Sequence, residues 1–578
     1  MSALNATTNH STGASESAVA APESLALRRL AYWEKTAPDR TAFIQPRGGG
    51  AVDEYTWREV LDQARRMATY LQRLGIGPGD RVAILAKNTA HWLMSDYAIW
   101  LAGGVSVPLY PTLSSRTVRQ ILEHSGARLL FVGKLDGWQG IKAGIPADLP
   151  CVSHPLAPAD AREAYPRWDD IVARSLPLQA VPERGADELA TIMYTSGTTG
   201  EPKGVMHSFG AFALAVEAGL RRIPMGPDSR MLSYLPLAHV VERALVEHGQ
   251  LATGMQVYFA ESASTFTQDL QRARPTSFFS VPRLWLKFQQ GINANLPQKQ
   301  LDLLLRIPVL SGIVKRRILT ALGLQQCTFA ACGAAPMPVA LLRFYARLGL
   351  RVFEGYGMTE NIGSTHLTTG DDADIGTVGR PYAGVQCRID PATGEVQVRC
   401  AWLMQGYYRE PALTRDAFTA DGWLRTGDQG AIDAAGRLTI TGRVKDLFKT
   451  SKGKYVAPAP IEDRLVMHAA VEACCVTGAN LRQPLALLVL NLEATAMAAS
   501  PEGRGELEHS LARHMAAVNE TLDPHEQLEC LVVTREAWTT GNDLITPTLK
   551  VKRNKIEDRF AARYEQWVGM RKKVIWTE

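Results

Sequence analysis

Residues 81–132 read RVAILAKNTAHWLMSDYAIWLAGGVSVPLYPTLSSRTVRQILEHSGARLLFV, and their pattern indicates the fold class. Apolar runs of strand length alternate here with segments of helical length. The strands are expected at Arg81–Leu85, Val105–Leu109 and Arg128–Val132, and the helices at Ala90–Leu101 and Ser115–His124. Strands and helices that alternate at these lengths are typical of βαβ units, whose strands join a mostly parallel sheet. The pattern therefore predicts an α/β fold.

The same pattern continues towards the C-terminus and then changes. Further buried strands are expected at Met231–Leu235, Thr276–Val281 and Gln326–Ala331. From about residue 380, short strands separated by Gly, Asp and Pro predict a small β-barrel-like subdomain. After Gly442 the sequence becomes basic and mixed, with helices expected near Pro460–His468 and Glu506–Asn519.

These changes divide the chain into a large domain of layered, mostly parallel sheets with helices and a small α+β C-terminal domain. We expect a disordered tail over residues 1–24, the N-terminal domain over 25–442, a connection at 443–446 and the C-terminal domain over 447–578.

Composition excludes several classes of protein. The 578 residues are too many for one hydrophobic core, and a net charge of +5 is too weak an excess to indicate a nucleic-acid partner. The eight cysteines lack zinc-site spacing, as is usual for reduced thiols in a cytoplasmic protein. Neither a signal peptide nor an apolar run of about 18 residues is present, so we expect a soluble or peripherally membrane-bound protein.

The stretch Tyr194–Gly204, YTSGTTGEPKG, is a candidate phosphate-binding loop that follows an apolar run. Its glycines allow left-handed turns, and its N–H groups and hydroxyls can surround phosphate oxygens. Lys203 adds a compact cation. The loop lacks Walker A spacing, and clusters of Ser, Thr and Gly are also common in surface turns. From these residues alone, both interpretations stay open.

Two later motifs carry chemistry of the same kind. Gly355–Glu360, GYGMTE, combines an aromatic ring that can stack on a purine with a hydroxyl and a carboxylate suited to phosphate and Mg²⁺. Asp421–Asp428, DGWLRTGD, ends in a carboxylate that can accept hydrogen bonds from both hydroxyls of a ribose. It precedes Gly442–Asp446, GRVKD. Each motif taken alone is also compatible with a connecting turn.

In this order the motifs resemble those of the adenylate-forming, or AMP-binding, superfamily, from about Leu25 to Ile575. The resemblance implies that the ATP phosphates are bound by Thr195, Ser196, Gly197, Thr198, Thr199, Gly200 and Lys203. It implies that Thr195 and Glu360 bind Mg²⁺ and that Thr359 meets the α-phosphate. It also implies adenine contacts from Gly333, Ala334, Ala335 and Tyr356, and ribose or phosphate contacts from Asp428 and Arg443.

The resemblance extends into the C-terminal domain. Lys445 occupies the family's hinge position, about which the small domain rotates between two steps. Gly453, in KGKYVAP, resembles the glycine that meets CoA. Lys550, in TPTLKVKR, corresponds to the family's catalytic lysine, although Leu549 stands where the family usually has glycine and other basic residues lie nearby.

Three stretches resemble the long-chain acyl-CoA synthetase subgroup: LPLAHVVER at 235–243, VPRLWLKF at 281–288 and TSKGKYVAP at 450–458. His239 is therefore a candidate for the wall of the acyl or carboxylate pocket, with a buried structural histidine as the alternative. The apolar faces of Phe209–Leu220 and Val240–Leu251 suit an acyl tunnel, and core packing explains them equally well.

The implied function is ATP- and Mg²⁺-dependent activation of a long-chain fatty acid to acyl-AMP, with release of pyrophosphate, followed by transfer to CoA. One alternative is an acyl-AMP ligase that passes the acyl group to a carrier-protein phosphopantetheine, and another is a non-catalytic lipid-binding scaffold. Leu301–Leu324 mixes large apolar and basic residues, as in a segment at a membrane surface or in a buried helix pair with a basic edge. We expect a cytoplasmic protein, with contact at the inner face of the membrane left open.

Overall fold

The computed structural model describes residues 19–196, 202–546 and 550–577, and for Ser196 only the backbone. The predicted phosphate-loop residues Gly197, Thr198, Thr199 and Gly200 lie outside the described residues, as do the first 18 residues of the expected tail. Within the remainder of that expected tail, Pro22–Ser24 forms the short 3-10 helix η1.

The predicted βαβ region forms the centre of a sheet with the strand order β18-β8-β7-β4-β3-β5-β6. Its strands are β3 (Arg81–Leu85), β4 (Val105–Leu109), β5 (Leu129–Val132), β6 (Cys151–Ser153), β7 (Leu189–Ser196), β8 (Pro202–Ser208) and β18 (Gly406–Tyr407). From β7 to β6 the neighbouring strands pair in parallel, whereas β8 and β18 add antiparallel pairing at one edge. The apolar runs are buried because helices cover the sheet.

Helix α3 (Ala90–Leu101) shows why this layer forms. All its residues are buried, because the helix lies between the sheet and α2 (Trp57–Arg73). The Oγ1 atom of Thr89 accepts a hydrogen bond from the Trp92 N–H at 3.2 Å and so caps the N-terminus of α3. Helix α4 (Ser115–Ser125) is capped in the same way by Ser114 and ends at Gly126, whose φ of 61° is left-handed.

Two further sheets extend the large domain. One has the order β2-β1-β10-β9, from β1 (Thr41–Gly48), β2 (Ala51–Thr56), β9 (Arg230–Ser233) and β10 (Gln256–Phe259). The other has the order β11-β12-β13-β14-β15, from β11 (Ser277–Ser280), β12 (Phe329–Cys332), β13 (Val352–Tyr356), β14 (His366–Leu367) and β15 (Arg380–Pro381). Strands β11, β12 and β13 pair in parallel, as the layered arrangement predicts.

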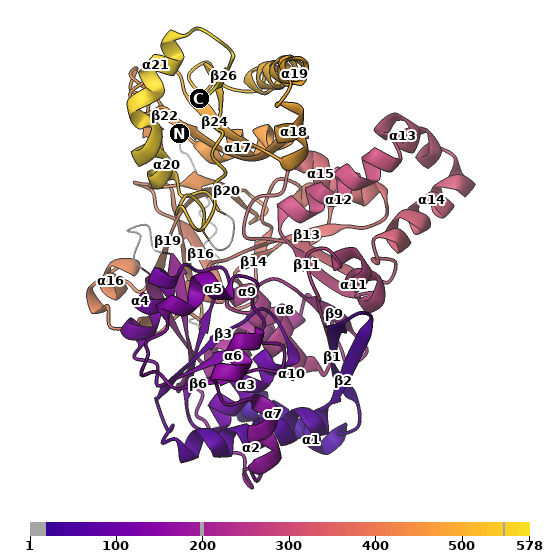
Figure 1. The fold of residues 1–578 in the computed structure, drawn as a ribbon. Helices are drawn as coiled ribbons and strands as arrows, with labels where there is room; N and C mark the ends of the chain where they lie inside the picture. The colour runs from indigo at the N-terminus through magenta and orange to yellow at the C-terminus, as the bar shows by residue number, and fades with distance from the viewer. Residues whose placement is uncertain (1–18, 197–201, 547–549, 578) are drawn as a thin grey trace, which may run out of the picture.

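The short strands after residue 380 form an antiparallel sheet in the order β16-β17-β19-β20, which is the predicted small subdomain. Its strands are β16 (Gln386–Ile389), β17 (Glu395–Arg399), β19 (Leu424–Ile432) and β20 (Leu438–Arg443). The C-terminal domain holds β21 (Phe448–Lys449), β22 (Tyr455–Val456), β23 (Val471–Thr477), β24 (Leu485–Leu490), β25 (Leu531–Val533) and β26 (Val574–Trp576). This domain lies against one end of the large domain (Figure 1), and its mixed sheet has its own apolar core.

The remaining helices cover these sheets and connect them. They are α1 (Ala26–Thr36), α5 (Trp138–Ile141), η2 (Lys142–Gly144), α6 (Ala159–Ala164), α7 (Trp168–Arg174), α8 (Phe209–Leu220), α9 (Val240–Glu242), the π-helix η3 (Arg243–His248), α10 (Gly249–Thr253), α11 (Phe266–Ala273), α12 (Pro282–Asn295), α13 (Gln298–Arg306), α14 (Pro308–Ala321), α15 (Val339–Arg347), η4 (Thr359–Asn361), η5 (Asp372–Asp374), α16 (Pro411–Ala417), α17 (Pro458–Leu465), α18 (Leu492–Met497), α19 (Pro501–Asn519), α20 (Arg553–Phe560), η6 (Ala561–Arg563) and α21 (Tyr564–Gly569). The α/β fold class is confirmed. Among the described residues, no helix is both long and apolar enough to cross a bilayer.

Candidate active site

A cavity of about 2360 Å³ brings the predicted motifs together between the large domain and the C-terminal domain. Residues from the separate motifs share its wall, although they come from distant parts of the sequence. The predicted site residues that line it are Thr195, Lys203, His239, Gly333, Ala334, Ala335, Tyr356, Thr359, Glu360, Asp428, Arg443, Lys445 and Lys550. Clustering of this kind does not follow from any motif taken alone.

The glycine-rich loop connects two antiparallel strands at the edge of the main sheet. Thr195 on β7 pairs with Lys203 on β8, so the strands hold both residues at the base of the loop. The next residue along β8 is Gly204, and this position has no room for a side chain because a Cβ there would lie 2.7 Å from Cγ2 of Ile192. The strand pair therefore holds Thr195 and Lys203 in the wall of the cavity.

Glu360 occupies η4, directly after β13, and its carboxylate is buried. Its Oε1 atom accepts a hydrogen bond from the hydroxyl of Tyr407 at 2.7 Å. Burial raises the pKa of Glu360, while the Tyr407 hydroxyl and the positive charges of Arg443 and Lys203 act in the opposite direction. The preceding carbonyl, that of Thr359, lies 2.7 Å from Nε2 of His207, which anchors the turn to β8.

Tyr407 is a site residue that sequence reasoning missed. Besides its bond to Glu360, its ring centroid lies 5.5 Å from Nζ of Lys203, so the tyrosine contacts both an expected metal ligand and an expected phosphate-binding lysine. Tyr407 reaches them because β18 pairs with β8, where it faces Val205. No local spacing signals this contact, since the residues lie far apart in the sequence.

Two residues of the wall adopt left-handed backbone that is uncommon outside glycine. Ala334, in the expected adenine pocket, has φ 67°, and Ile362, at the C-terminal end of η4, has φ 57°. Each such residue costs about 1–2 kcal/mol, and a β-branched residue is the rarer case. Strained backbone of this kind concentrates where a site requires a fixed shape.

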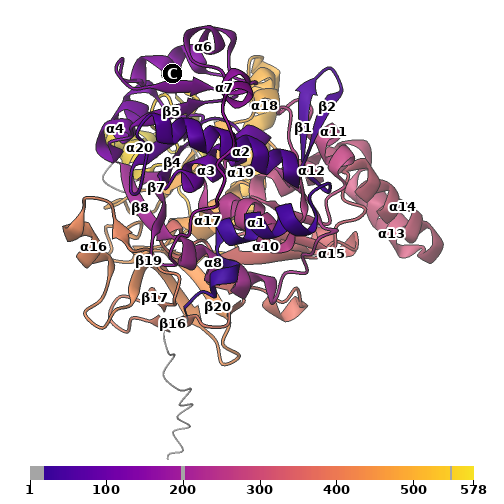
Figure 2. The same cartoon turned by 90° about the horizontal axis from the view of Figure 1, so that it is seen from below.

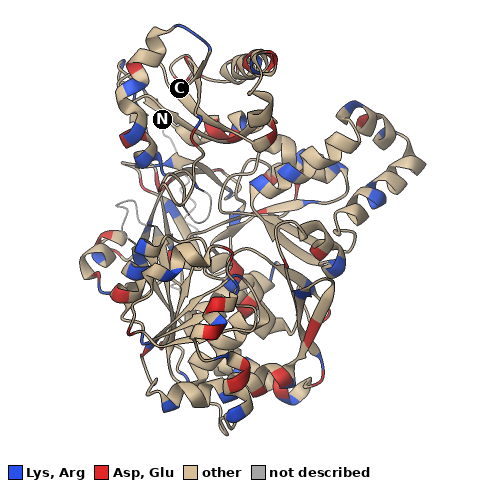
Figure 3. Cartoon of the chain, in the orientation of Figure 1, with Lys and Arg blue, Asp and Glu red and all other residues tan. Residues whose placement is uncertain are grey.

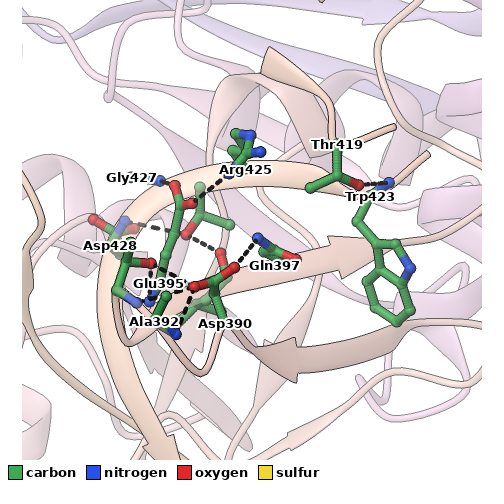
Figure 4. A network of polar contacts seen from close by, with 12 residues as sticks. Asp390, Ala392, Glu395, Gln397, Thr419, Trp423, Arg425, Gly427 and Asp428 are labelled. Carbon is green, nitrogen blue, oxygen red and sulfur yellow. Dashed lines mark hydrogen bonds and ion pairs between the residues drawn. The ribbon is translucent and has the colours of Figure 1, made fainter. Parts of the chain in front are cut away.

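Asp428 is the centre of a polar contact network on the small antiparallel sheet. Arg443 lies opposite it on β20, with 3.0 Å between its Nε and Oδ1 of Asp428. The hydroxyl of Tyr356 donates to Oδ2 of Asp428 at 2.8 Å, and burial beside this carboxylate raises the pKa of the tyrosine well above its ordinary value. Figure 4 shows Glu395 of the neighbouring strand β17 beside this part of β19, where it accepts a hydrogen bond from the Gly427 N–H at 2.9 Å.

Lys550 enters the cavity from the C-terminal domain. Two hydrogen bonds with Thr546 hold it: Thr546 N donates to the Lys550 carbonyl at 2.8 Å, and Lys550 N donates to Oγ1 of Thr546 at 3.1 Å. Lys550 is exposed within the open cavity, and the surrounding cavity wall lowers its pKa by desolvation. Arg443 lowers the pKa further, and Asp428 raises it. The lysine therefore lies within electrostatic reach of the residues expected at the ribose.

His239 combines the two interpretations that the sequence left open. Its Nδ1 atom accepts from the Val241 N–H at 3.3 Å and caps α9, and the same side chain lines the cavity. Burial, with a smaller effect from Lys550, lowers the pKa of His239 to about 4, so it is neutral near pH 7. It can therefore present a neutral polar edge to a substrate but no positive charge.

An apolar branch of the cavity continues from this histidine. It runs between α8 and the helical path through α9, η3 and α10, and its lining includes Ala215, Gly219, Val240, Ala244, Leu245 and Gly249. Helix α8 spans Phe209–Leu220, the bounds that the sequence predicted. Val240–Leu251 is helical as expected but changes to π-helical geometry at Arg243–His248. These faces line a cavity and also pack in the core, as both interpretations required.

The expected hinge and CoA residues differ in position. Lys445 lines the cavity in the turn that follows β20. Gly453, with φ 75°, lies in the turn between β21 and β22, and the cavity wall does not include it. This arrangement of the domains thus brings Lys550, and not Gly453, to the polar groups.

The donor atoms present suit Mg²⁺ bound together with a nucleotide. No group of three or more His, Cys, Asp or Glu side chains placed to hold a metal occurs in the described part of the chain. Mg²⁺ usually retains waters and takes one or two carboxylates plus substrate phosphates. A buried Glu360 beside Lys203 and Thr195 meets that requirement.

The chain is similar to known proteins in sequence and in fold. Residues 30–408 match the AMP-binding enzyme family, and residues 445–567 match the AMP-binding enzyme C-terminal domain. The long-chain-fatty-acid–CoA ligase FadD15 of Mycobacterium tuberculosis is 32% identical, over 89% of this chain and 92% of the relative. Long-chain-fatty-acid–CoA ligase 1 of Homo sapiens is 28% identical, over 88% and 82%. The adenylation domain of a carboxylic acid reductase from Segniliparus rugosus, solved with AMP and a carboxylic acid, superimposes with a TM-score of 0.78 at 22% identity, covering 94% of each chain.

Proposed function

Because the chain belongs to the AMP-binding enzyme family, in its long-chain acyl-CoA synthetase subgroup, we propose that it is a long-chain fatty acid–CoA ligase. It joins a fatty carboxylate to the α-phosphorus of ATP, releases pyrophosphate, and then transfers the acyl group from AMP to the thiol of CoA. The observation that carries this proposal is that one cavity joins an apolar branch to a polar site. Lys203 of the large domain and Lys550 of the C-terminal domain both line that polar site.

In the first step the two reacting groups are anions, so charge must be neutralised where they meet. We assign Lys203 and the hydroxyl of Thr195 to the β- and γ-phosphates, and Lys550 to the carboxylate and α-phosphate, because all three line the cavity. Glu360 and Thr195 would hold Mg²⁺, which supplies Lewis-acid stabilisation of the phosphate oxygens. Since these groups act by positioning and charge, no side-chain nucleophile is required.

The nucleoside is held by the second polar group. Asp428 accepts from the ribose hydroxyls with Arg443 beside it, and Tyr356 packs on the adenine against Gly333, Ala334 and Ala335. The hydrogen bond from Tyr356 to Asp428 links the two subsites, because it fixes the ring while its partner binds the sugar. Thr359 meets the α-phosphate.

The second step requires a different arrangement of domains. A thiol must reach the acyl carbon, and the role assigned above to Lys550 puts that lysine in its way. We propose that residues 447–578 rotate as a unit against residues 25–442 about residues 443–446, with Lys445 as the pivot. The rotation removes Lys550 and brings Gly453 to the pantetheine arm, where a glycine allows close backbone approach.

The test is palmitate-dependent ATP consumption, following pyrophosphate and AMP with and without CoA. Repeated AMP release that requires CoA, with palmitoyl-CoA as product, supports the proposal. Acyl-AMP that forms but stays bound until a phosphopantetheine carrier protein is added identifies an acyl-AMP ligase instead. Absence of pyrophosphate with acids of every chain length points to a non-catalytic scaffold.

We further propose that the enzyme acts in the cytoplasm and meets its substrate at the inner face of the membrane. Long-chain acids partition into bilayers because each buried methylene contributes about 0.8 kcal/mol. An enzyme that contacts the bilayer would therefore meet its substrate where it is most concentrated.

A further inference from the structure

Helices α13 and α14 form a hairpin that projects from the large domain in both views (Figures 1 and 2). Their inner residues pack against the domain, and Leu301 is buried there. None of the residues of α14 is buried. None of the described residues of the hairpin lines the catalytic cavity, so catalysis as proposed above leaves this feature unexplained.

The outer surface of the hairpin is apolar at its tip. The large apolar side chains most exposed there are Leu303 (62%), Ile307 (42%), Val309 (76%), Leu310 (39%) and Ile313 (60%). They lie close together along the chain: Ile307 separates the two helices, and Val309 and Leu310 lie in the first turn of α14. Leu303 and Ile313 each lie about one helical turn further from Ile307 or Val309, on α13 and α14 respectively. A contiguous exposed patch of this kind marks an interaction surface, whereas scattered single residues do not.

Basic residues border the apolar tip (Figure 3). Lys299 and Arg306 lie on α13, and Lys315, Arg316 and Arg317 on α14. Among the described residues, no carboxylate forms an ion pair with any of the three cations on α14. The acidic residue of the hairpin, Asp302, is itself paired with Arg347 of the neighbouring helix at 2.6 Å. The hairpin surface therefore carries an uncompensated positive charge.

The spacing of these two features suits a lipid bilayer. Val309 and Arg316 are seven residues apart on one helix, which is about 10 Å along its axis. Amphipathic segments bury their apolar face about 5–10 Å into the boundary between headgroups and acyl chains. An inserted tip would thus place Arg316 and Arg317 at the level of the lipid phosphates.

A second copy of the chain is a poorer occupant of the same surface. In a two-fold dimer the patch on one copy meets the identical patch on the other. The arginines and Lys315 would then face like charges across the interface, which opposes association. Anionic lipid satisfies both the apolar tip and the cationic border.

We propose that the α13–α14 hairpin is a docking surface for anionic membrane lipid. The tip inserts its apolar side chains, and the cations on α14 bind the headgroup phosphates. Binding at this surface is independent of the catalytic cavity and does not require the proposed reaction.

The experiment is flotation of the full-length protein with vesicles of phosphatidylcholine alone or mixed with phosphatidylglycerol. The wild type should bind the anionic vesicles at least tenfold more tightly than the neutral ones, and less tightly as salt rises. Val309→Ser with Ile313→Ser should reduce binding to the anionic vesicles at least tenfold. Arg316→Gln with Arg317→Gln should remove the preference for anionic lipid.

Leu492→Ser is the matched control, because Leu492 is 88% exposed on the C-terminal domain, away from the hairpin. It should bind vesicles like the wild type. Turnover of octanoate, which dissolves in water, should be unchanged in every variant, so that loss of binding is separated from loss of folding or catalysis. The proposal would be overturned if the wild type does not bind anionic vesicles or if the hairpin variants bind them as well as the wild type. It would also be overturned if the wild type is a dimer and the hairpin variants are monomers.

Discussion

Gly219→Leu should shorten the acyl chain that the enzyme accepts. Gly219 lines the apolar branch near the end of α8, and a Cβ there meets only Cδ1 of Ile223, at 3.8 Å. The helical path from His239 to Gly249 spans ten residues, or about 15 Å at the α-helical rise. Gly249 lies beside Met225 at that far end, as a Cβ on it would be 3.4 Å from the methionine methyl group. The substitution therefore fills the deep part of the branch.

The size of the effect follows from the volume added. A leucine side chain occupies the space of about three to four methylenes, each worth about 0.8 kcal/mol when buried. Palmitate should lose about 2.4–3.2 kcal/mol of binding, which is a decrease of about 60- to 200-fold in kcat/KM. Octanoate has half as many carbons and should change by less than about threefold. Folding is not at risk, since leucine favours a helix over glycine by about 1 kcal/mol.

The assay is kcat/KM for both acids with saturating ATP and CoA. Gly505→Leu serves as the control, because Gly505 is an exposed helical glycine of α19 with no atom within 4 Å of a built Cβ. It should behave like the wild type with both acids. Equal losses for palmitate and octanoate, or undiminished activity on palmitate, would refute the assignment of the branch to the acyl chain.

Lys550→Ala should abolish acyl-AMP formation and spare thioester formation from supplied acyl-AMP, and equal loss of both half-reactions would contradict its role. Because desolvation and Arg443 lower the pKa of Lys550, adenylation should fall on the alkaline side at a lower pH than an ordinary lysine pKa of about 10.4, and Lys550→Arg should move that limb upwards. Lys445→Pro should form acyl-AMP and fail to transfer it, so wild-type turnover would disprove the pivot. Tyr407→Phe should weaken Mg²⁺-dependent ATP binding about tenfold in calorimetry and leave metal-free binding unchanged, whereas Tyr408→Phe, at the neighbouring residue, should leave both kinds of binding unchanged.

Secondary structure was predictable where apolar runs had clear ends. Strands β3 and β4 and helix α3 have the expected bounds, because a Pro-Gly-Asp sequence, a pair of glycines and a capping Thr89 separate them. The ordered motifs also supplied the candidate site residues, and most of those that the structure describes line one cavity. What did not follow were contacts made only by sheet pairing, such as that of Tyr407 with Glu360.

The domain arrangement is a second feature that motifs alone could not settle. Both Lys550 and Gly453 resemble family residues that meet the substrate, but one rigid arrangement can bring only one of them to the cavity. The motifs in a sequence include residues that act in different conformations of the enzyme, whereas one structure shows a single conformation. Their separate positions are the result that the proposed rotation predicts, and they do not argue against either residue.

The motif LPLAHVVER indicated the substrate class, yet two of its residues, Glu242 and Arg243, do not line the cavity. Arg243 is fully buried, with Nε 2.9 Å from Glu247 and an ion pair to Asp96, and burial raises the pKa of both carboxyl groups. One guanidinium cannot compensate two ionised carboxylates that are shielded from water. The pair formed by Asp96 and Glu247 therefore retains a proton. These interactions hold the π-helix η3 in place, and Ala244 and Leu245 of the same helix line the apolar branch. Part of a motif can thus indicate the acyl substrate without lining its pocket, because Glu242 and Arg243 support the wall to which His239 and Val240 belong.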